Sequence, residues 1–249
     1  MYRPRVIPVL QLKGKGLVKT TTFKNSRYIG DPINAVKIFN NFEADELIFV
    51  DISATNENRS ISVELVKQIG DEAYMPFAVG GGIKRLSTAI ELINAGAEKI
   101  ILNTLFGENP KIISQIAKTL GSQSVVVSID IKRNWFGKYR FYINSGRVQT
   151  KLDPISAAKK AVDLGVGEIV VNYINYDGLM KGYNLELIKS ITESVSIPVI
   201  AACGAGNMLH MKQAIESGAQ AVAAGSLFVY HGSRKAILIN YPPKTELIF

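Results

Sequence analysis

Short apolar runs of strand length alternate with amphipathic stretches of helical period along the whole chain. The predicted strands are Arg5–Leu12, Glu46–Ile52, Met75–Val79, Lys99–Leu102, Ser124–Ile131, Glu168–Asn172, Ile197–Ala202 and Gln220–Ala224. The predicted helices are Pro32–Asn41, Ser62–Ile69, Leu86–Ala95, Pro110–Thr119, Pro154–Leu164, Leu185–Ser194, Met208–Ser217 and Gly232–Ile239. Eight such alternations without a linker predict one α/β domain over residues 1–249, a closed (β/α)8 TIM barrel rather than an open doubly wound sheet.

Local signals support these boundaries. Asp31-Pro32, Asn109-Pro110 and Asp153-Pro154 each place a capping residue before a proline, which is typical of a helix start. The polar and aromatic segment 134–150 is expected to form a hairpin after the fifth strand.

A weak internal repeat indicates two pseudo-symmetric half-barrels. Gly82, Gly96-Ala97 and Asn103-Thr104 recur 122 residues later as Gly204, Gly218-Ala219 and Gly225-Ser226. Such halves would place matching sites on opposite sides of one barrel mouth. Glycine and alanine are common in these turns, so coincidence is the alternative.

Composition narrows the class of protein. The chain has 249 residues, 47% of them hydrophobic, and one cysteine, Cys203, which excludes an internal disulfide framework and favours a reducing cytoplasm. The N-terminus does not resemble a secretion signal, and no apolar run approaches a membrane span. His210 and His231 lie too far apart to indicate a metal site, and no cofactor motif is expected.

The net charge of +8 comes from lysines spread along the chain, densest at Lys13, Lys15, Lys19, Lys24 and Arg27. This distribution favours an anionic small molecule or an acidic partner protein over nucleic acid.

Barrel enzymes hold their chemistry at the carboxyl ends of the strands. The residues expected there are Gln11, Asp51, Gly80-Gly81-Gly82, Asn103-Thr104, Asp130, Asn172, Asp177-Gly178, Gly204 and Gly225-Ser226. The first glycine run with Asn103-Thr104, and Gly204-Ala205-Gly206 with Gly225-Ser226, predict two phosphate cradles, because converging backbone N–H groups need glycine to admit a phosphate. Glycines that merely permit tight turns are the alternative for either run alone. The symmetric pair indicates a long ligand with a phosphate at each end.

Two carboxylates at the mouth are candidates for acid–base chemistry. Asp130 ends the fifth strand and Asp51 the second, although each is also suited to capping a loop. Lys19 lies in a long first loop, in which Gly14 and Gly16 are expected to act as hinges of a lid.

Charged residues also begin four strands. Arg5, Glu46, Lys99 and Glu168 predict a salt-bridged ring that closes the barrel floor. A structural plug is the simplest interpretation of such a ring.

Taken together, these residues resemble the HisF family, the cyclase subunits of imidazole glycerol phosphate synthase, over essentially the whole chain. The matching stretches are Asp31-Pro32, Asp45-Glu46-Leu47, Phe49-Val50-Asp51-Ile52, Pro76 to Ile83, Gly96-Ala97, Asn103-Thr104, Glu108-Asn109-Pro110, Gly121 to Asp130, Asp177-Gly178 and Gly204-Ala205-Gly206.

The resemblance implies a partner, a HisH-type glutaminase whose ammonia passes through the barrel to the mouth. There the family combines it with a bisphosphorylated ribonucleotide (PRFAR), giving imidazole glycerol phosphate and AICAR. The floor ring then resembles the family's ammonia gate, Glu98 a partner-facing residue, and Lys19 part of the mobile loop over the substrate.

The chain departs from the family at position 11. The family uses two aspartates, on opposite sides of the mouth, as general acid and base. Asp130 matches one of them, but Gln11 stands in the place of the other. An amide cannot exchange a proton usefully near neutral pH. Asn172, Tyr173 and Cys203 also differ from the family at what is expected to be the same mouth. The pattern is similar to paralogues linked to surface polysaccharide (lipopolysaccharide O-antigen) genes, thought to supply ammonia to an amidotransferase-like third protein that converts an acetamido sugar to an acetamidino one.

Three functions therefore stay open: an ammonia-delivering subunit for sugar amidination, an active cyclase of histidine biosynthesis, and a scaffold or activator of a glutaminase without turnover. An isomerase of the related HisA type fits less well, because that chemistry also needs an acid–base pair.

Overall fold

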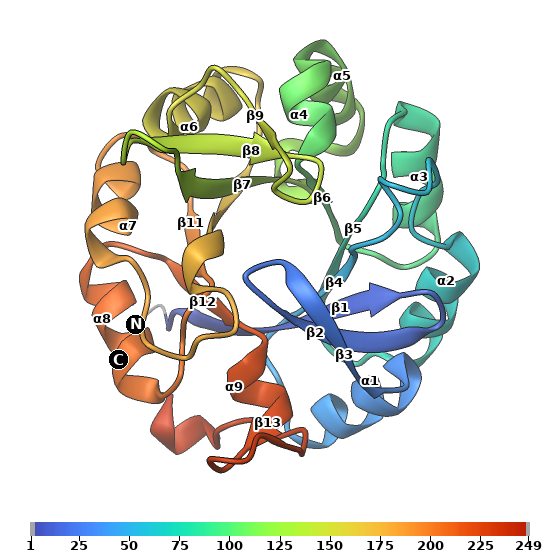
Figure 1. Ribbon diagram of the computed structural model, residues 1–249. Coiled ribbons are helices and arrows are strands. Elements are labelled where there is room, and N and C mark those ends of the chain that lie inside the picture. Colours follow the sequence, from blue (N-terminus) through green and yellow to red (C-terminus); the bar gives the residue numbers. More distant parts are fainter. Residues whose placement is uncertain (1–2, 248–249) are drawn as a thin grey trace.

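The computed structural model describes residues 3–247 and shows a closed barrel of eight parallel strands (Figure 1). The barrel strands are β1 (Arg5–Lys13), β4 (Leu47–Asp51), β5 (Phe77–Gly80), β6 (Lys99–Leu102), β7 (Val125–Arg133), β10 (Glu168–Tyr173), β11 (Val199–Ala202) and β12 (Ala221–Ala224). Each pairs with the next in this order, and β12 pairs with β1 to close the ring. The predicted (β/α)8 barrel is confirmed.

Helices surround the strands (Figure 1). They are α1 (Pro32–Asn41), α2 (Val63–Glu72), α3 (Leu86–Asn94), α4 (Thr104–Glu108), α5 (Pro110–Leu120), α6 (Pro154–Asp163), α7 (Leu185–Thr192), α8 (Met208–Glu216) and α9 (Ser226–Val229), with 3-10 turns at Ser122–Ser124, Ile174–Tyr176 and Lys244–Glu246. Asp31 and Asp153 cap α1 and α6 as predicted, since each side chain accepts a hydrogen bond from a first-turn N–H. The short helices α4 and α9 begin at matching positions of the internal repeat.

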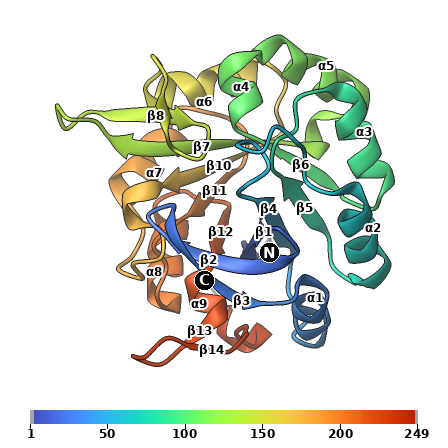
Figure 2. The same ribbon diagram turned by 45° about the vertical axis from the view of Figure 1, so that its right-hand side comes forward.

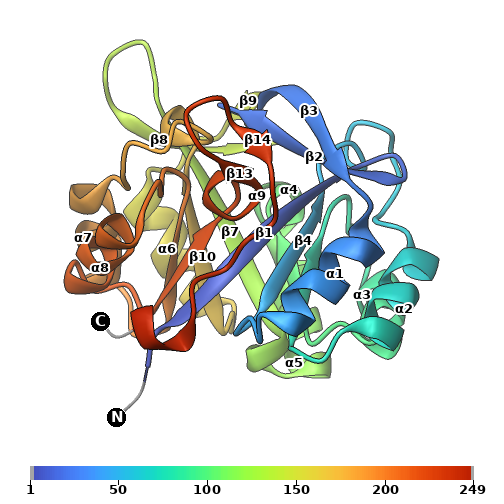
Figure 3. The ribbon, with the colours of Figure 1, turned by 90° about the horizontal axis from the view of Figure 1, so that it is seen from below.

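Three antiparallel elements stand over the carboxyl ends of the strands, as Figures 2 and 3 show. They are β2 (Gly16–Thr21) with β3 (Lys24–Gly30), β8 (Tyr139–Ile143) with β9 (Val148–Gln149), and β13 (Tyr230–His231) with β14 (Ala236–Ile237). The second is the hairpin predicted after the fifth strand, because β7 continues past the barrel and pairs with β8. The first refines an expectation: the long first loop that contains Lys19 is a hairpin over residues 16–30, whose β2 pairs with β1.

The predicted helix Gly232–Ile239 is wrong. Gly232 and Lys235 both have positive φ, which breaks a helical path, and the segment forms the turn between β13 and β14. Residues 231–238 are exposed, so an apolar helix face would have nothing to pack against. Within residues 3–247, the short α9 is the one α-helix after the eighth barrel strand.

Two hydrophobic clusters separate the inside of the barrel from its outside. The larger cluster fills the space between strands and helices and includes Phe39, Phe49, Phe106 and Phe228. The smaller one lines the lumen with Ile7, Ile48, Ala78, Ile101, Val126, Val170, Ile200, Ala202, Ala221 and Ala223. The lumen is therefore apolar between its two polar ends.

A polar barrel mouth over a charged floor

The pleat of each strand aligns floor, lumen and mouth residues, because every second side chain points inward. On β1 this inward series runs Arg5, Ile7, Val9 and Gln11, so one strand carries a floor charge, two apolar lumen residues and a mouth amide. The same spacing places Glu168, Val170 and Asn172 on β10; Lys99, Ile101 and Asn103 on and after β6; and Val126, Ser128 and Asp130 on β7.

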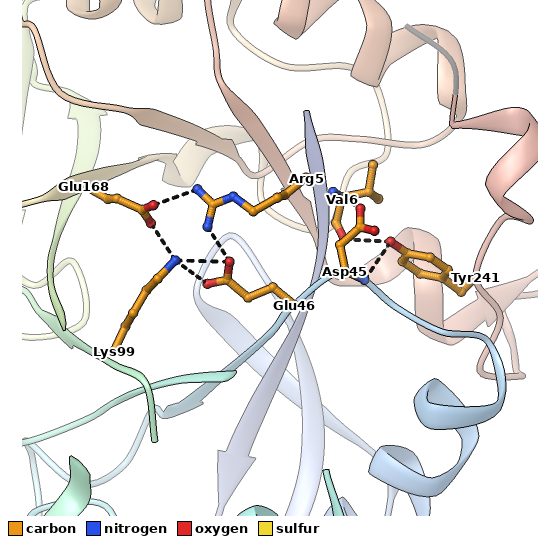
Figure 4. Close-up of polar contacts among 7 residues, drawn as sticks. All are labelled: Arg5, Val6, Asp45, Glu46, Lys99, Glu168 and Tyr241. Atoms are coloured by element: carbon orange, nitrogen blue, oxygen red, sulfur yellow. Dashed lines mark hydrogen bonds and ion pairs between the residues drawn. The ribbon is translucent and has the colours of Figure 1, made fainter. Parts of the chain in front are cut away.

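The four predicted floor residues form one closed ring of alternating charge (Figure 4). Arg5 pairs with Glu46, and its other terminal nitrogen lies 2.8 Å from Oε1 of Glu168. Lys99 Nζ lies 3.1 Å from carboxylate oxygens of both glutamates, so it completes the ring from the opposite side. The charges are satisfied mutually, which explains how they remain partly buried at the end of an apolar lumen.

Arg5 is stabilised in its charged form by both glutamates. Burial alone would lower the pKa of the Arg5 guanidinium, but the charges of Glu46 and Glu168 outweigh it and raise that pKa. Next to the ring, Asp45 accepts a hydrogen bond from Val6 N at 2.9 Å, and the Tyr241 hydroxyl donates to Val6 O at 2.8 Å (Figure 4). These contacts fix the start of β1.

A cavity of about 630 Å³ occupies the mouth at the other end. Its walls include every predicted mouth residue: Gln11, Lys19, Asp51, Gly82, Asn103, Thr104, Asp130, Asn172, Asp177, Gly178, Gly204, Gly225 and Ser226. The predicted positions are thus brought together from all sides of the barrel, although their roles stay predictions.

Asp130 lies buried at the centre of a polar chain. Ser128 Oγ and Asn172 Nδ2 both donate to its Oδ1, at 2.9 and 3.0 Å. Burial raises the pKa of Asp130 to about 6, against the opposing effect of these two donors. A carboxyl group with such a pKa exchanges a proton near neutral pH, as general acid–base catalysis requires.

This row of polar side chains extends from Asn172 to Cys203, whose Sγ lies 3.5 Å from Asn172 Oδ1. Cys203 has φ +68°, a left-handed conformation that favours glycine. Burial raises the pKa of its thiol well above the usual range, so the neutral thiol faces the cavity. Cys203 therefore supports the Asn172 amide rather than providing a nucleophile.

Gln11 has a structural role that the sequence did not reveal. Its Oε1 accepts a hydrogen bond from the backbone N of Thr20 at 2.9 Å, and the Thr20 hydroxyl oxygen lies 3.1 Å from the same atom. Thr20 lies on β2, so the Gln11 side chain fastens the β2–β3 hairpin to the barrel wall.

Asp177 fastens the same hairpin from the opposite wall. Its carboxylate accepts from Lys19 Nζ at 2.7 Å, from the Thr20 hydroxyl at 2.9 Å and from Phe23 N at 3.2 Å. Lys19 is only 5% exposed and is a buried partner of Asp177, and the role of this segment as a lid stays a prediction. The hairpin thus closes over one side of the cavity.

The side chains of the first predicted cradle are engaged within the protein. Asn103 Nδ2 donates to the carbonyls of Ser128 and Tyr142, and Thr104 Oγ1 accepts from Asn144 N at 3.1 Å. Gly82 has φ +64°, and a Cβ there would lie 1.8 Å from the Arg59 carbonyl oxygen. Packing alone therefore requires this glycine.

The second predicted cradle contains a hydroxyl group without a hydrogen-bond partner. Ser226 Oγ is buried, and it has no hydrogen-bond partner within residues 3–247. A Cβ on Gly204 would lie 2.1 Å from the Gly182 carbonyl oxygen, and one on Gly225 would lie 2.9 Å from Cε of Lys19. A buried hydroxyl with no partner beside the Lys19 side chain suits an anionic group better than the first cradle does.

For Asp51 the contacts favour the loop-capping alternative, and for Tyr173 the expected place at the mouth needs correction. Asp51 accepts from Ser53 N and Ala54 N at 3.0 and 3.1 Å and pairs with Arg59, so its carboxylate caps a loop. Tyr173 points outward from β10, and its ring lies 4.7 Å from that of Tyr176 and away from the cavity walls. Besides Gln11, three residues differ from the family pattern, and of these Asn172 and Cys203 line the mouth cavity whereas Tyr173 does not.

Sequence reasoning missed Thr20, Ser128 and Lys132, which also line the cavity. Ser128 and Lys132 lie two residues on either side of Asp130, so the strand period alone would have identified them. Thr20 had no such indication, because its position depends on the hairpin. The described residues contain no cluster of three or more His, Cys, Asp or Glu side chains able to hold a metal ion, and no helix among them is long and apolar enough to cross a membrane.

Replacing the buried carboxylate should change the pH dependence of stability. Because folding raises the pKa of Asp130 to about 6, its ionised form destabilises the folded protein above that pH. This destabilisation decreases as the pH falls below about 6 and is absent below about 4, where the carboxyl group is protonated in the unfolded chain as well. Asp130→Asn should therefore raise the free energy of unfolding near pH 8 by at most about 3 kcal/mol, with the gain vanishing near pH 4. Urea unfolding at several pH values measures this; Asp163→Asn, exposed on α6, is the control. A gain independent of pH would contradict the assignment.

Gln11→Ala should loosen the β2–β3 hairpin without unfolding the barrel. Losing a net hydrogen-bond contribution of ~1 kcal/mol multiplies the open population by roughly five. Tryptic cleavage at Lys24 and Arg27, and hydrogen exchange at the Thr20 amide, should accelerate accordingly. Gln123→Ala, remote from the mouth, should leave both rates unchanged, and unchanged rates in Gln11→Ala would exclude the fastening role.

Comparisons with known proteins agree with this architecture. Residues 5–235 match the family described as histidine biosynthesis protein. The chain is 48% identical over 248 residues to a Leptospira borgpetersenii protein provisionally named imidazole glycerol phosphate synthase subunit HisF, covering 99% of this chain and 98% of that protein. A Pseudomonas aeruginosa protein provisionally named subunit hisF2 is 44% identical, covering 99% of both chains.

An Endomicrobium trichonymphae protein carries the HisF subunit name without qualification. It is 42% identical over 226 residues, which cover 91% of this chain and 87% of that protein. With the closed eight-stranded barrel, these similarities show that the chain belongs to the HisF family of histidine biosynthesis proteins.

Proposed function

We propose that this HisF-family barrel takes ammonia from a HisH-type glutaminase at its floor and releases it at its mouth. There the ammonia serves an amidotransferase-like protein that converts an acetamido sugar to an acetamidino sugar in surface polysaccharide (lipopolysaccharide O-antigen) biosynthesis. The observation that carries this proposal is the contrast between a complete floor ring and a mouth whose Gln11 holds a hairpin.

The floor supports entry of a small neutral molecule. The ring joins only side chains, and the single amine of Lys99 bridges both glutamates, so movement of that one amine would open the end of the lumen. Beside it lies a hollow lined by Gly96, Ala97, Glu98 and Lys99, with Glu98 exposed. This hollow is where we place the glutaminase.

The lumen supports passage of ammonia rather than ammonium. Its walls are aliphatic, with alanines at positions 78, 202, 221 and 223. An apolar interior penalises an unpaired cation far more than it penalises neutral ammonia. Protonation is therefore disfavoured until the molecule reaches Ser128, Asn172 and Asp130.

The mouth supports a change of acceptor. The cyclase reaction of the family uses two carboxylates, and here the acceptor oxygen of Gln11 is engaged by Thr20. Asp130 is left as one titrating carboxyl group.

An active cyclase of histidine biosynthesis is the second candidate. Asp130, with its pKa of about 6, and the similarity to HisF subunits named without qualification favour it. A scaffold that only activates a glutaminase is the third, and the floor ring alone would suffice for it.

Turnover of PRFAR by the purified chain, with excess ammonium salt and no glutaminase, separates these candidates. We expect no detectable product, because loss of one acid–base group costs roughly 10²–10⁴-fold in rate. Gln11→Asp then tests whether position 11 alone is responsible, and Asp130→Asn in that background is the control. Clear turnover by the unaltered chain would make it a cyclase.

Lys99→Ala should separate the two sources of nitrogen. With glutaminase and amidotransferase-like protein present, product formed from glutamine should fall several-fold more than product formed from ammonium, since ammonium can enter from the mouth. Lys118→Ala, on α5, serves as the matched control. Equal losses with both nitrogen sources would remove the gate from the proposal.

A further inference from the structure

The hairpin that extends β7 and β8 beyond the barrel carries the most exposed aromatic pair of the described residues. Trp135 is 97% exposed and Phe136 82% exposed, side by side at its tip. Figure 3 shows this loop standing above the rest of the mouth face, on the side opposite the termini. Two large rings held in water are costly in an isolated protein and typical of an interaction site.

The tip is ordered by its own hydrogen bonds. Asn134 Oδ1 accepts from the backbone N of both Phe136 and Lys138 at 3.0 Å, and Asn134 N donates to Lys138 O at 2.9 Å. The backbone of the turn is therefore ordered before any partner arrives, which lowers the entropy cost of binding.

The base of the hairpin is anchored to the barrel. The Arg133 guanidinium lies over the Tyr139 ring, 4.9 Å from its centroid, and donates to the Tyr139 hydroxyl at 3.0 Å. The same hydroxyl accepts from Asn184 Nδ2 at 2.8 Å, and Asn184 caps α7. These contacts hold the base of the hairpin in a fixed position relative to the barrel.

The hairpin is strongly basic. Between residues 131 and 152 the sequence has six cationic residues and no acidic one: Lys132, Arg133, Lys138, Arg140, Arg147 and Lys151. Lys132 and Arg147 also line the mouth cavity, so the basic surface is continuous with the site. The surface is complementary to an acidic protein face.

We propose that Trp135 and Phe136 are the docking point for the enzyme that consumes the ammonia, whose acidic face covers the barrel mouth. This inference rests on the proposed function. Ammonia that leaves the mouth into water is protonated and loses its nucleophilic lone pair, so delivery needs the next active site to be seated over the opening. The aromatic tip anchors that partner beside the cavity, and the cations orient it.

A second copy of this chain is a poorer occupant. A twofold dimer through the hairpin would bring the same surface of both copies together and set one group of six cations against another. An anionic membrane suits basic and aromatic residues as well, but it would cover the opening without consuming ammonia.

The test uses the full chain with its glutaminase and the amidotransferase-like protein of the same organism. The dissociation constant of that protein should rise about tenfold or more in the double variant Trp135→Ser/Phe136→Ser. Affinity for the glutaminase should stay unchanged, since the tip lies at the opposite end of the barrel. Tyr74→Ser, which removes an 86% exposed aromatic side chain at the floor end of β5, is the matched control and should not alter the affinity for the acceptor protein.

A second variant examines the charges. Lys138→Glu/Arg140→Glu should slow association severalfold at low salt, and the difference should shrink at high salt. Unchanged affinity in the aromatic variant, with the complex still forming, would overturn the docking point and leave the proposed function standing.

Other outcomes are equally informative. If the unaltered chain neither binds the acceptor protein nor transfers ammonia to it, the proposed function and the docking proposal fail together. Sedimentation that shows dimers abolished by the tip variant would assign the tip to a second copy. Tip-dependent binding to vesicles of anionic phospholipid, without binding to the acceptor protein, would assign it to a membrane.

Discussion

A strand in a closed parallel barrel offers only every second side chain to the interior, and this constraint arranges the whole functional axis of the molecule. On β1 the inward positions carry Arg5, Ile7, Val9 and Gln11, which are a floor charge, two lumen residues and a mouth amide. A shift of one residue would turn all four outward into the helix layer. The floor ring, the apolar lumen and the polar mouth are therefore consequences of one register, held by strand pairing around the ring.

The mouth depends on a second set of contacts, those between the barrel and the β2–β3 hairpin. Gln11 and Asp177 reach the hairpin from opposite walls, and both engage Thr20. The ion pair of Lys19 with Asp177 is buried. Separating the two side chains would leave the Lys19 ammonium buried without a counter-charge, which costs free energy unless another anion takes the place of Asp177. An anionic ligand at the second cradle would supply such a replacement, which links occupation of the site to the position of the hairpin.

The sequence predicted the eight barrel strands because each is a compact apolar run bounded by turn residues. The strand ends then placed Asp130 and Asn172 at the mouth, and the strand starts placed the floor ring. It could not predict that residues 16–30 pair with β1, or that residues 232–239 lack a helix, since both depend on packing partners distant in the chain. Its glycines were harder to interpret. Gly82 and Gly204 fit phosphate cradles, yet close approach of the Arg59 and Gly182 carbonyls already demands them. The sequence shows that glycine is required there but not which contact requires it.

All three antiparallel additions leave the barrel at the carboxyl ends of its strands, and the floor ring lies at the other end of the lumen. Floor and mouth share strands but no side chains, so mutations can accumulate in one while selection preserves the other. After a gene duplication, one copy can keep the protein that supplies its ammonia and gain a new acceptor through changes confined to the mouth. In a family of such barrels, sequence differences between members with different acceptors are therefore expected to concentrate at the mouth, while the floor ring stays the same.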